Sequence, residues 1–464
     1  MPPPAPHDLL DDLKFRGQVH QSTDEAALRR HLSTPRKVYC GFDPTADSLT
    51  IGNLVSIMGL RRFQIAGHTP VVVMGGGTGM IGDPSGKSAE RQLQTLETVA
   101  ANVRSQERIF RALLSFEGPN AAVVVNNADW LGRLNYIELL RDIGKHFSVN
   151  EMVKRDSVRD RLTREQGISY TEFSYVILQA YDYLHLFKEM GVTVQIGGSD
   201  QWGNIVSGGD LIRRLLPEIL DRRHQHLDTL QEPHRSAFFL EQIKPLEDAD
   251  ATGSVSHALT WPLITKADGT KFGKTESGAV WLTRERTSPY AFYQFWLNAA
   301  DADVMKFMKT FTLLPRAEIE ALEAAHAADP GKREAHRALA RHMTEMLHGR
   351  ADLERAEAAA GALFSGDVAS LDLETLNEVF ASVPSSTHSR SELVGEGLPM
   401  ADVLAMTTLA KSKREAREHL SSGAVTLNGE RVGETDRLTA ARLLHGSLAV
   451  LRRGKKAWHV TRWG

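Results

Sequence analysis

The sequence predicts an α/β fold with a doubly wound parallel sheet, followed by a helical domain and a small C-terminal α+β domain. Three observations lead to this prediction. In the first half of the chain, short apolar runs alternate with longer stretches of helical periodicity, as in the strand–helix units of a parallel sheet. After the stretch TSPYAFYQFW the chain is largely helical, as RAEIEALEAA and HRALARHMTEMLHG show. The final segment has its own small α/β pattern.

The expected elements of the first half follow a regular order. Buried strands are expected at VYC, which begins at Val38, and then at TPVVVM, AAVVVNNADW and VTVQIGGSDQWGN. Helices are expected at IGNLVSIMGLRRFQIAG, from Ala89 to Leu114, and at TEFSYVILQAYDYLHLF. Ligands of such sheets bind at the carboxyl ends of the strands. Because a glycine-rich loop directly follows TPVVVM, we expect that loop at the ligand-binding edge.

Composition and charge limit the classes of protein that fit. The 464 residues are 42% hydrophobic and 24% charged, with a net charge of −3, which is ordinary for a globular protein. From Pro399 to Gly464, 12 Lys and Arg stand against 6 Asp and Glu; this net +6 leaves −9 elsewhere and indicates a polyanion partner for the segment. The single cysteine, Cys40, excludes an intrachain disulfide. Without a membrane-length apolar run or a targeting signal, we expect a cytoplasmic protein.

The glycine-rich loop GGGTGMIGDPSGKS, from Gly75 to Ser88, is similar in composition to a nucleotide-binding P-loop. A P-loop requires a glycine five residues before the glycine of Gly-Lys-Ser. Ile81 occupies that position, and the nearby Gly82 is one residue too close. The spacing therefore argues against a P-loop phosphotransferase. On turn chemistry alone, Gly82-Asp83-Pro84 fits a tight turn as well as it fits a functional loop.

One predicted helix carries a polar stripe. Tyr175, Gln179 and Asp182 are spaced i, i+4 and i+7, which places them within roughly 60° on one face. An isolated stripe of this kind is usually a solvent-exposed face. It is also the arrangement expected of a pocket wall that holds a polar ligand. The spacing alone leaves both interpretations open.

Three separate stretches, YCGFDPTADSLTIGNL, QIGGSDQWGN and KADGTKFGKTESG, resemble the active-site segments of bacterial tyrosyl-tRNA synthetases, which are class I aminoacyl-tRNA synthetases. The resemblance covers most of the chain, and SKREAREHLSSGAVTLNGERV is similar to S4-type RNA-binding domains. It implies a Rossmann-like catalytic domain, a helical anticodon-binding domain, a linker and an S4-like domain. The expected bounds are 1–284, with an insertion near 217–255, then 285–384, 385–397 and 398–464.

The resemblance implies a site for the amino acid L-tyrosine. Tyr39 and Asp182 would contact its phenolic hydroxyl. The ammonium group would be held by Tyr175, Gln179 and Asp83, so the polar stripe would line a pocket. The glycine-rich loop would then deliver Asp83 and would not wrap a triphosphate. A pocket that bonds the hydroxyl rejects phenylalanine by about 10⁵-fold without editing, for which tyrosyl-tRNA synthetase is itself the standard example.

The resemblance also implies that ATP is a substrate, with Mg²⁺ carried by the nucleotide. Because the carboxylate of tyrosine is ionised at pH 7, its attack on ATP needs positioning and charge stabilisation more than a general base. The implied catalytic residues are Thr45, Thr50, Lys271, Lys274 and Thr275. The implied ATP-binding residues are Gly41, Asp43, Gly52, Asn53, Gly198, Asp200, Gln201 and Lys274. Cys40 either touches the ribose or is buried packing. No metal site is expected.

Two features depart from the family pattern. The signature that usually begins with histidine reads Thr50-Ile51-Gly52-Asn53 here. Threonine can donate one hydrogen bond to a phosphate but carries no charge, so we expect it to keep a weakened form of the role. The second departure is the stretch 217–255, which the family usually crosses in a few residues. The irregular spacing of its histidines argues against a metal site, and we expect a surface excursion.

The basic C-terminal segment and the resemblance together predict tRNA-Tyr as a partner and a homodimer as the assembly. The expected RNA contacts are Lys411, Lys413, Arg414, Arg417, Arg452, Arg453, Lys455 and Lys456. The main interpretation is a tyrosine–tRNA ligase. A tryptophanyl-tRNA synthetase is an alternative, but it has no need for the hydroxyl-reading pair. The alternative from another class is an activation-deficient paralogue that binds structured RNA; Thr50 favours it weakly, whereas the intact lysines and aspartates speak against it.

Overall fold

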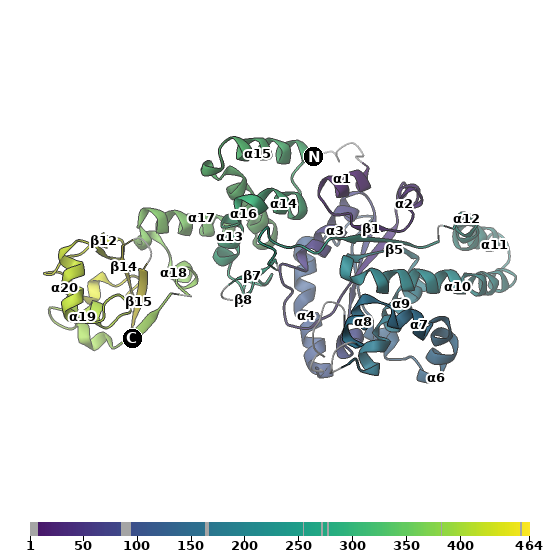
Figure 1. Cartoon of the computed structure of the whole chain (residues 1–464), viewed down its shortest axis with the longest axis horizontal. Helices are drawn as coiled ribbons and strands as arrows, with labels where there is room; N and C mark the ends of the chain where they lie inside the picture. Colours follow the sequence, from purple (N-terminus) through teal and green to yellow (C-terminus); the bar gives the residue numbers. More distant parts are fainter. Residues whose placement is uncertain are drawn as a thin grey trace. The chain divides into compact units, whose positions relative to one another are not determined.

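The computed structural model describes residues 8–84, 94–162, 167–253, 255–270, 272–275, 278–381, 383–454 and 457–464. The chain forms two compact units (Figure 1). The first comprises Met1–Arg286 and Ala300–Ala335, and the second comprises Thr287–Ala299 and His336–Gly464. Among the described residues, no helix combines the length and the apolar character that crossing a membrane requires.

The first unit is built on the predicted parallel sheet. Its strands are β1 (Gln21–Ser22), β2 (Lys37–Phe42), β3 (Thr69–Met74), β4 (Val123–Asn126), β5 (Val192–Gly198) and β6 (His257–Trp261). They lie in the order β1-β6-β5-β2-β3-β4, and only β1 runs antiparallel to its neighbour. The four strands expected from the sequence are β2 to β5, so the doubly wound architecture is confirmed.

The strand order places the ligand-binding crevice. β2 lies between β3 and β5, with Tyr39 opposite Val71 on one side and Gln195 on the other. From β2 the chain proceeds outward through β3 and β4, and it then returns to the other side of β2 with β5. The order therefore reverses between β2 and β5, and ligands of such sheets bind outside the carboxyl ends at this point.

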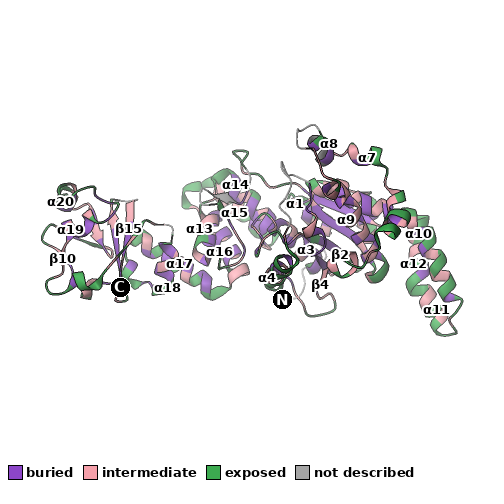
Figure 2. Cartoon of the chain, turned by 90° about the horizontal axis from the view of Figure 1, so that it is seen from below, coloured by how far each residue is buried: buried purple, intermediate pink, exposed green. Residues whose placement is uncertain are grey.

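Helices cover the sheet and explain why its strands are almost continuously apolar (Figure 2). The helices of this part are α1 (Leu9–Phe15), α2 (Glu25–His31), α3 (Leu54–Ile65), α4 (Leu96–Leu113), α5 (Ala128–Leu131), α6 (Tyr136–Glu138), α7 (Val149–Val153), α8 (Asp156–Leu162), α9 (Tyr170–Met190) and α10 (Trp202–Leu227). The helix expected from Ala89 corresponds to α4; residues 85–93 lie outside the described part of the chain.

Helix α9 is fixed firmly at both ends and in its middle. Ser169 caps its first turn by accepting from Glu172 N, and Gly191 ends it with a left-handed φ of 68°. In its middle the buried Tyr183 hydroxyl donates toward Thr193 O (2.7 Å) and His257 O (3.0 Å). These contacts hold α9 against β5 and β6, so the polar stripe of α9 has a defined position relative to the sheet.

Residues 217–253 form a helical arm. Helix α10 continues through Pro217 to Leu227 and is followed by α11 (His234–Phe238), a π-helical turn at Phe239–Ile243 and α12 (Lys244–Ala251). The arm extends from the sheet and is largely exposed along α11 and α12 (Figures 1 and 2). Its two sides are joined by a contact of His224 Nε2 with Glu247 Oε1 (3.0 Å).

The largely helical region contains α13 (Pro289–Leu297), α14 (Asp301–Phe311), α15 (Arg316–Ala328), α16 (Glu334–His348), α17 (Arg350–Ser365) and α18 (Leu373–Val379). The structure places α14 and α15 in the first unit and the other four helices in the second. Two short strands, β7 (Lys274–Thr275) and β8 (Gly278–Ala279), precede this region and pair with each other.

Two buried arginines attach α14 to the first unit. Arg62 Nη2 donates to the carbonyl oxygens of Thr310 (2.8 Å) and Thr312 (2.7 Å), and Arg16 Nη1 donates to Thr312 O (3.0 Å). The last carbonyls of a helix have no partner within the helix and carry its negative dipole end, so guanidinium groups satisfy both needs. Burial, and then the neighbouring Arg16, lower the pKa of Arg62 to about 9.

The second unit ends in a five-stranded sheet with two helices. Its elements are β9 (Ser385–His388), β10 (Leu398–Pro399), α19 (Met400–Ala405), α20 (Lys413–Ser421), β11 (Val425–Leu427), β12 (Glu430–Arg431), β13 (Arg437–Leu438), β14 (Leu448–Arg453) and β15 (Ala457–Trp463). The order of the large sheet is β12-β11-β14-β15-β9. Buried leucines such as Leu427 and Leu451 form its core with α19 and α20, which agrees with the predicted α+β domain.

The linker expected at 385–397 is wrong in its first residues. Ser385–His388 forms β9, which pairs in parallel with β15 and so belongs to the sheet. Ser386 Oγ lies 2.7 Å from His388 Nε2 and 3.0 Å from His459 Nε2. Pairing with β15 and these polar contacts order a stretch whose serine-rich composition is typical of a linker.

The buried His459 makes the C-terminal sheet sensitive to acid. Burial, and then His388, lower the pKa of His459 below its usual 6.5. The unfolded chain protonates His459 from about pH 6.5 downward, whereas the folded chain resists this protonation. The contribution of neutral His459 to stability is therefore complete above that pH and is lost as the pH falls. We expect the second unit to lose up to about 1.4 kcal/mol per pH unit in this range.

Denaturant unfolding followed at pH 7.5 and pH 5.5 measures this loss. In a His459→Gln variant, which lacks this titrating group, the difference in unfolding free energy between the two pH values should shrink. An unchanged difference would show that other groups cause the acid sensitivity.

Candidate active site

Four loops meet at the carboxyl edge of the sheet. They follow β2, β3, β4 and β5 and contain, in that order, Asp43, the glycine-rich loop, Asn127 and Asp200. Helix α9 supplies the polar stripe that faces them. The structure therefore brings together residues that lie far apart in the sequence, as the strand-end rule predicts.

The glycines of the glycine-rich loop are required by packing against protein. A Cβ on Gly75 would lie 2.2 Å from Asp43 Oδ1, and one on Gly76 would lie 2.2 Å from Asn126 Oδ1. A Cβ on Gly79 would lie 3.0 Å from Pro44. The loop packs tightly against the loops that follow β2 and β4, which leaves these glycines no role as a phosphate cradle. Lys87 and Ser88 lie outside the described residues.

Asp182 is held by two donors that the sequence did not reveal. Asn127 Nδ2 donates to Asp182 Oδ2 (2.9 Å), and Trp130 Nε1 donates to Asp182 Oδ1 (2.7 Å). The side chain of Asn127 is itself fixed, because its Oδ1 accepts from Gly77 N (2.7 Å). Asn127 directly follows β4 and Trp130 lies in the next helix, α5, so the position of Asn127 at a strand end was the available signal. They orient the carboxylate of Asp182 before any ligand arrives.

Asp182 and Tyr39 form an electrostatically coupled buried pair. Burial raises the pKa of Asp182 to about 7, although the hydrogen bonds from Asn127 and Trp130 act in the opposite direction. Burial, and then Asp182, hold the pKa of Tyr39 well above its usual value, so its phenol remains protonated. Within the described part of the chain, the buried Tyr39 hydroxyl has no hydrogen-bond partner. Such an orphaned hydroxyl is costly unless a ligand satisfies it.

The polar stripe of α9 is a buried wall, so the solvent-face interpretation is wrong. Tyr175 and Asp182 are only 6% and 4% exposed. The Tyr175 hydroxyl donates to Asp43 Oδ2 (2.9 Å), and Asp43 Oδ1 accepts from Thr78 Oγ1 (2.8 Å). The oxygen of Tyr175 therefore keeps its acceptor capacity for a ligand cation.

A second chain of hydrogen bonds joins Asp83 to α9. Gln201 Nε2 donates to Asp83 Oδ2 (2.7 Å), and Asn204 Nδ2 lies 3.1 Å from Gln179 Oε1 and 3.3 Å from Gln201 Oε1. Asn204 is a buried connector that the sequence did not single out. Burial, and then Asp83, raise the pKa of Asp200. Four acidic residues at this edge, Asp43, Asp83, Asp182 and Asp200, suit a ligand that carries a positive charge.

The start of α3 adjoins the loop of β7 and β8. Ile51 N donates to Val280 O (2.9 Å), and Val280 N donates to Gly273 O (3.0 Å). Gly273 has a φ of +82°, and a Cβ there would lie 2.5 Å from Ile51 Cγ2. The ring of Phe272 packs against those of Phe307 and Phe311 of α14, with ring centroids 4.8 Å and 5.1 Å away. These contacts place Gly273 beside Ile51 of the segment TIGN and fix Phe272 against α14.

The remaining predicted residues differ in how far the structure describes them. Thr45 is exposed, and its backbone N donates to Asp43 O (2.9 Å). Lys271 lies outside the described residues, whereas the backbones of Lys274 and Thr275 pair with Ala279 and Gly278. Cys40 is buried, as expected of a packing residue, and burial raises the pKa of its thiol to about 12.

Gly52 and Gly76 should respond differently to alanine. A Cβ on Gly76 would lie 2.2 Å from Asn126 Oδ1, so Gly76→Ala should destabilise the protein by about 1–3 kcal/mol. At Gly52 a Cβ would make only an ordinary contact, 3.5 Å from Thr50 Oγ1. Gly52→Ala should therefore leave the melting temperature unchanged. It should raise the KM for ATP, because the resemblance implies that the nucleotide binds at this glycine. Thermal unfolding and ATP titration distinguish the two; a large loss of stability in Gly52→Ala would contradict this assignment.

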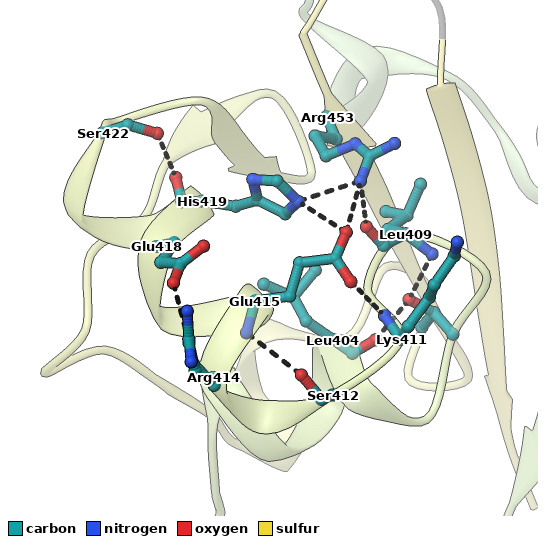
Figure 3. A network of polar contacts seen from close by, with 11 residues as sticks. Leu404, Leu409, Lys411, Ser412, Arg414, Glu415, Glu418, His419, Ser422 and Arg453 are labelled. Carbon is teal, nitrogen blue, oxygen red and sulfur yellow. Dashed lines mark hydrogen bonds and ion pairs between the residues drawn. The ribbon is translucent and has the colours of Figure 1, made fainter.

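The basic C-terminal residues divide into exposed and internally bonded groups (Figure 3). Lys411, Arg414 and Arg417 are exposed on or beside α20. Arg453 is held within the unit, because its Nη1 lies 2.6 Å from Leu409 O, 2.9 Å from His419 Nε2 and 3.5 Å from Glu415 Oε1. Arg453 therefore stabilises α20 through His419 and Glu415.

Of the other four basic residues, the structure describes Lys413 and Arg452. Lys413 forms an ion pair with Asp402 (2.9 Å). The guanidinium carbon of Arg452 lies 4.9 Å from the ring centre of Trp458, as in a cation–π contact. Lys455 and Lys456 fall outside the part of the chain that the structure describes.

Comparison with known proteins decides the family. A family model described as class I tRNA synthetases (W and Y) matches residues 32–365, and one described as the SYY-like C-terminal domain of tyrosine–tRNA ligase matches residues 375–461. The tyrosine–tRNA ligases of Geobacillus kaustophilus and Aeromonas hydrophila are each 48% identical to this chain, over 98% and 99% of its length and 100% and 99% of theirs. The chain belongs to the tyrosine–tRNA ligase family.

Solved structures agree with this assignment. The C-terminally truncated mitochondrial tyrosyl-tRNA synthetases of Aspergillus nidulans and Coccidioides posadasii have TM-scores of 0.65 and 0.61 and identities of 28% and 31%. They match 77% and 76% of this chain and 95% and 92% of their own lengths. The chain is thus an aminoacyl-tRNA synthetase with a class I fold, and an activation-deficient paralogue is not favoured. The match to the C-terminal domain model of tyrosine–tRNA ligases begins at residue 375, so the matched stretch includes β9.

Proposed function

We propose that this tyrosine–tRNA ligase activates L-tyrosine with ATP at the carboxyl edge of β2 and β5 and then transfers the tyrosyl group to the 3′ end of tRNA-Tyr. The observation that carries this proposal is the buried pair of Tyr39 and Asp182. One member has a hydroxyl that finds no hydrogen-bond partner among the described residues, and the other has a carboxylate oriented by two donors. Such a pair offers one donor and one acceptor to a phenolic hydroxyl. Phenylalanine would leave the Tyr39 hydroxyl without a partner and would offer Asp182 no phenolic donor in a buried site.

The rest of the pocket suits the amino-acid end of tyrosine. The oxygen of Tyr175 and the carboxylate of Asp83 would accept hydrogen bonds from its ammonium group, together with Gln179 Oε1. The Asn204 bridge and the Gln201 bond fix Gln179 and Asp83 in advance. Binding then requires little reorganisation, which holds the substrate carboxylate in one position.

In the first reaction, an oxygen of that carboxylate attacks the α-phosphorus of ATP. The new bond forms the mixed anhydride tyrosyl-adenylate, and the bond to the bridging oxygen breaks, so pyrophosphate leaves with its electron pair. No proton has to be removed, because the carboxylate is already ionised at neutral pH. Catalysis therefore rests on positioning and on cations near the departing charge, for which we propose Lys271, Lys274 and Thr275.

The nucleotide would lie over the start of α3 and the loop after β5. Gly41 and Gly52 would leave room for it, and Gly198 accommodates the Asp200 side chain, because a Cβ there would lie 2.5 Å from Asp200 Oδ1. Asp200 would accept from the ribose hydroxyls, and Thr45 would contact the outer phosphates. Two carboxylates of the edge already serve protein donors, since Asp43 accepts from Tyr175 and Asp83 accepts from Gln201. This arrangement suits Mg²⁺ that arrives bound to the nucleotide, where it would screen the phosphate charge.

The C-terminal unit would bind tRNA through the exposed basic residues of α20, with Lys411, Arg414 and Arg417 at phosphates. ATP-dependent and tyrosine-dependent charging of tRNA-Tyr tests the complete proposal. We expect a tyrosyl ester at the 3′ end of the tRNA. Adenylate formation without any charging would contradict the transfer step.

We also propose a homodimer in the cytoplasm. Exposed apolar side chains gather in the stretch from α6 to the start of α9: Tyr136 (57% exposed), Ile137 (67%), Leu140 (39%), Val149 (59%), Leu162 (51%) and Tyr170 (60%). The hydroxyls of Tyr136 and Tyr170 lie 3.4 Å apart, which joins the two ends of this stretch. Large exposed apolar areas mark protein interfaces. Sedimentation at micromolar concentration should give the mass of two chains, whereas a monomer would contradict the proposal.

The raised pKa of Asp182 predicts how tyrosine binding depends on pH. The ionised carboxylate accepts the phenolic hydrogen, and the protonated form does not. Since the pKa is about 7, the affinity for tyrosine should fall as the pH drops below 7, by up to about tenfold per unit. The KM for tyrosine measured from pH 5.5 to 8.5 reports this change. A flat profile in the wild type would contradict the role of Asp182 as the acceptor.

A further inference from the structure

The side chain of Asn53 is turned away from the helix that it precedes. Asn53 occupies the N-cap position of α3, with φ −72° and ψ −20°, and makes no capping hydrogen bond. Asparagine at this position usually accepts from a backbone N–H of the first turn. Here Oδ1 instead accepts from Thr50 N (3.0 Å) and from Thr50 Oγ1 (2.9 Å).

These two bonds determine the orientation of the amide. A backbone N–H can only donate, so the atom that faces Thr50 N must be the oxygen of Asn53 and not its nitrogen. Both acceptor sites of Oδ1 are then occupied. The Nδ2 group, with two hydrogens, must point the other way, and among the described residues it donates to no protein acceptor.

The same bonds leave Thr50 with little to offer a ligand. A hydroxyl has a single hydrogen, and that of Thr50 is donated to Asn53. Its backbone N–H is donated to the same oxygen, and its backbone also forms a bridge with Trp281. Direct donation from Thr50 to a phosphate would require breaking the contact that orients Asn53.

We propose that Thr50 is a positioning residue that acts through Asn53: it holds the amide of this residue, for which the resemblance already implies ATP binding, with Nδ2 directed at the nucleotide. This inference rests on the proposed function, since it assumes that the nucleotide lies over the start of α3. The adjacent Gly52 supports this placement: it is exposed, and a Cβ there would make only an ordinary contact, 3.5 Å from Thr50 Oγ1. The pair Thr50 and Asn53 thus replaces a signature histidine by a relay of two neutral groups.

A double-mutant cycle separates this relay from direct contact. Thr50→Val removes the hydroxyl but keeps the branched shape, and Asn53→Ala removes the amide. Adenylate formation is followed by tyrosine-dependent ATP–pyrophosphate exchange, with kcat and the KM for ATP and for tyrosine measured for the wild type, both single variants and the double variant. Thr229→Val, which removes a hydroxyl bonded to His226 O within the helical arm, controls for the loss of a hydroxyl elsewhere.

We expect Thr50→Val to lower kcat/KM for ATP by about 3- to 10-fold, the usual worth of one hydrogen bond. In the Asn53→Ala background, the same substitution should change it by less than about twofold, because the partner is gone. Thr50→Ser should restore the wild-type value, and the KM for tyrosine should not move.

Two results would overturn the inference. An equal loss from Thr50→Val in both backgrounds would show that Thr50 touches the nucleotide directly. An Asn53→Ala variant with unchanged ATP parameters would show that Nδ2 has no ligand. Failure of the proposed function is distinguishable, because the wild type itself would then show no exchange, and this outcome would overturn both.

Discussion

Replacing Asp182 by asparagine is expected to lower kcat/KM for tyrosine by about 10- to 150-fold. A hydrogen bond to a charged group contributes about 1.5–3 kcal/mol, which corresponds to this range. The substitution keeps the volume but places an NH₂ group where Asn127 Nδ2 and Trp130 Nε1 now donate. One of those donors would lose its acceptor, and the phenolic hydroxyl of the substrate would lose the charge.

Exchange kinetics with tyrosine and phenylalanine measure this effect. Discrimination against phenylalanine should collapse together with the activity on tyrosine, because in the proposed site phenylalanine leaves the Tyr39 hydroxyl without a partner and Asp182 without the phenolic donor. Asp129→Asn serves as the matched control, since Asp129 is an exposed acidic residue beside Trp130. If Asp182→Asn kept full discrimination, another group would have to read the hydroxyl.

Replacing Lys274 by alanine is expected to slow adenylate formation by about 10²- to 10³-fold, a magnitude typical of removing one group that stabilises developing charge. Departing pyrophosphate gains negative charge in the transition state, and a lysine in this loop offsets it. The backbone of Lys274 is paired with Ala279, so the loop should keep its path without the side chain.

The rate of a single turnover with saturating ATP and tyrosine measures the loss, and equilibrium dialysis measures tyrosine binding. The rate should fall while the dissociation constant for tyrosine stays the same. Lys332→Ala, on the exposed turn after α15, is the control for the loss of one positive charge. A parallel loss of tyrosine affinity would instead indicate damage to the pocket.

The parallel sheet could be predicted because its strands are covered on both faces. Such strands read as short, nearly continuous apolar runs, and TPVVVM of β3 is an example. The strand β9 could not be predicted in the same way. Its four residues, Ser385–His388, carry no apolar pattern, and they are ordered by pairing with β15 and by the contact of Ser386 with His459. These are contacts between segments far apart in the sequence.

The candidate site shows the same division between local and distant information. The motif resemblance implied Tyr39, Asp182 and Asp83 as site residues, and the structure places Tyr39 of β2 and Asp182 of α9 close enough to interact electrostatically. The residues that orient them, Asn127 and Asn204, belong to no motif, because an amide becomes a connector only when its partners arrive through space. The orientation of Thr50 toward Asn53 likewise required the geometry of the helix start.

Our central claim is that a buried pocket reads the phenolic hydroxyl of tyrosine and that tyrosine is activated there. Amino-acid-dependent ATP–pyrophosphate exchange tests this claim most directly, with tyrosine, phenylalanine and tryptophan compared in the absence of tRNA. Exchange with tyrosine alone is the predicted result, and it would also show that threonine at position 50 supports activation. A folded protein that gave no exchange with any of the three, or equal exchange with phenylalanine, would contradict the claim.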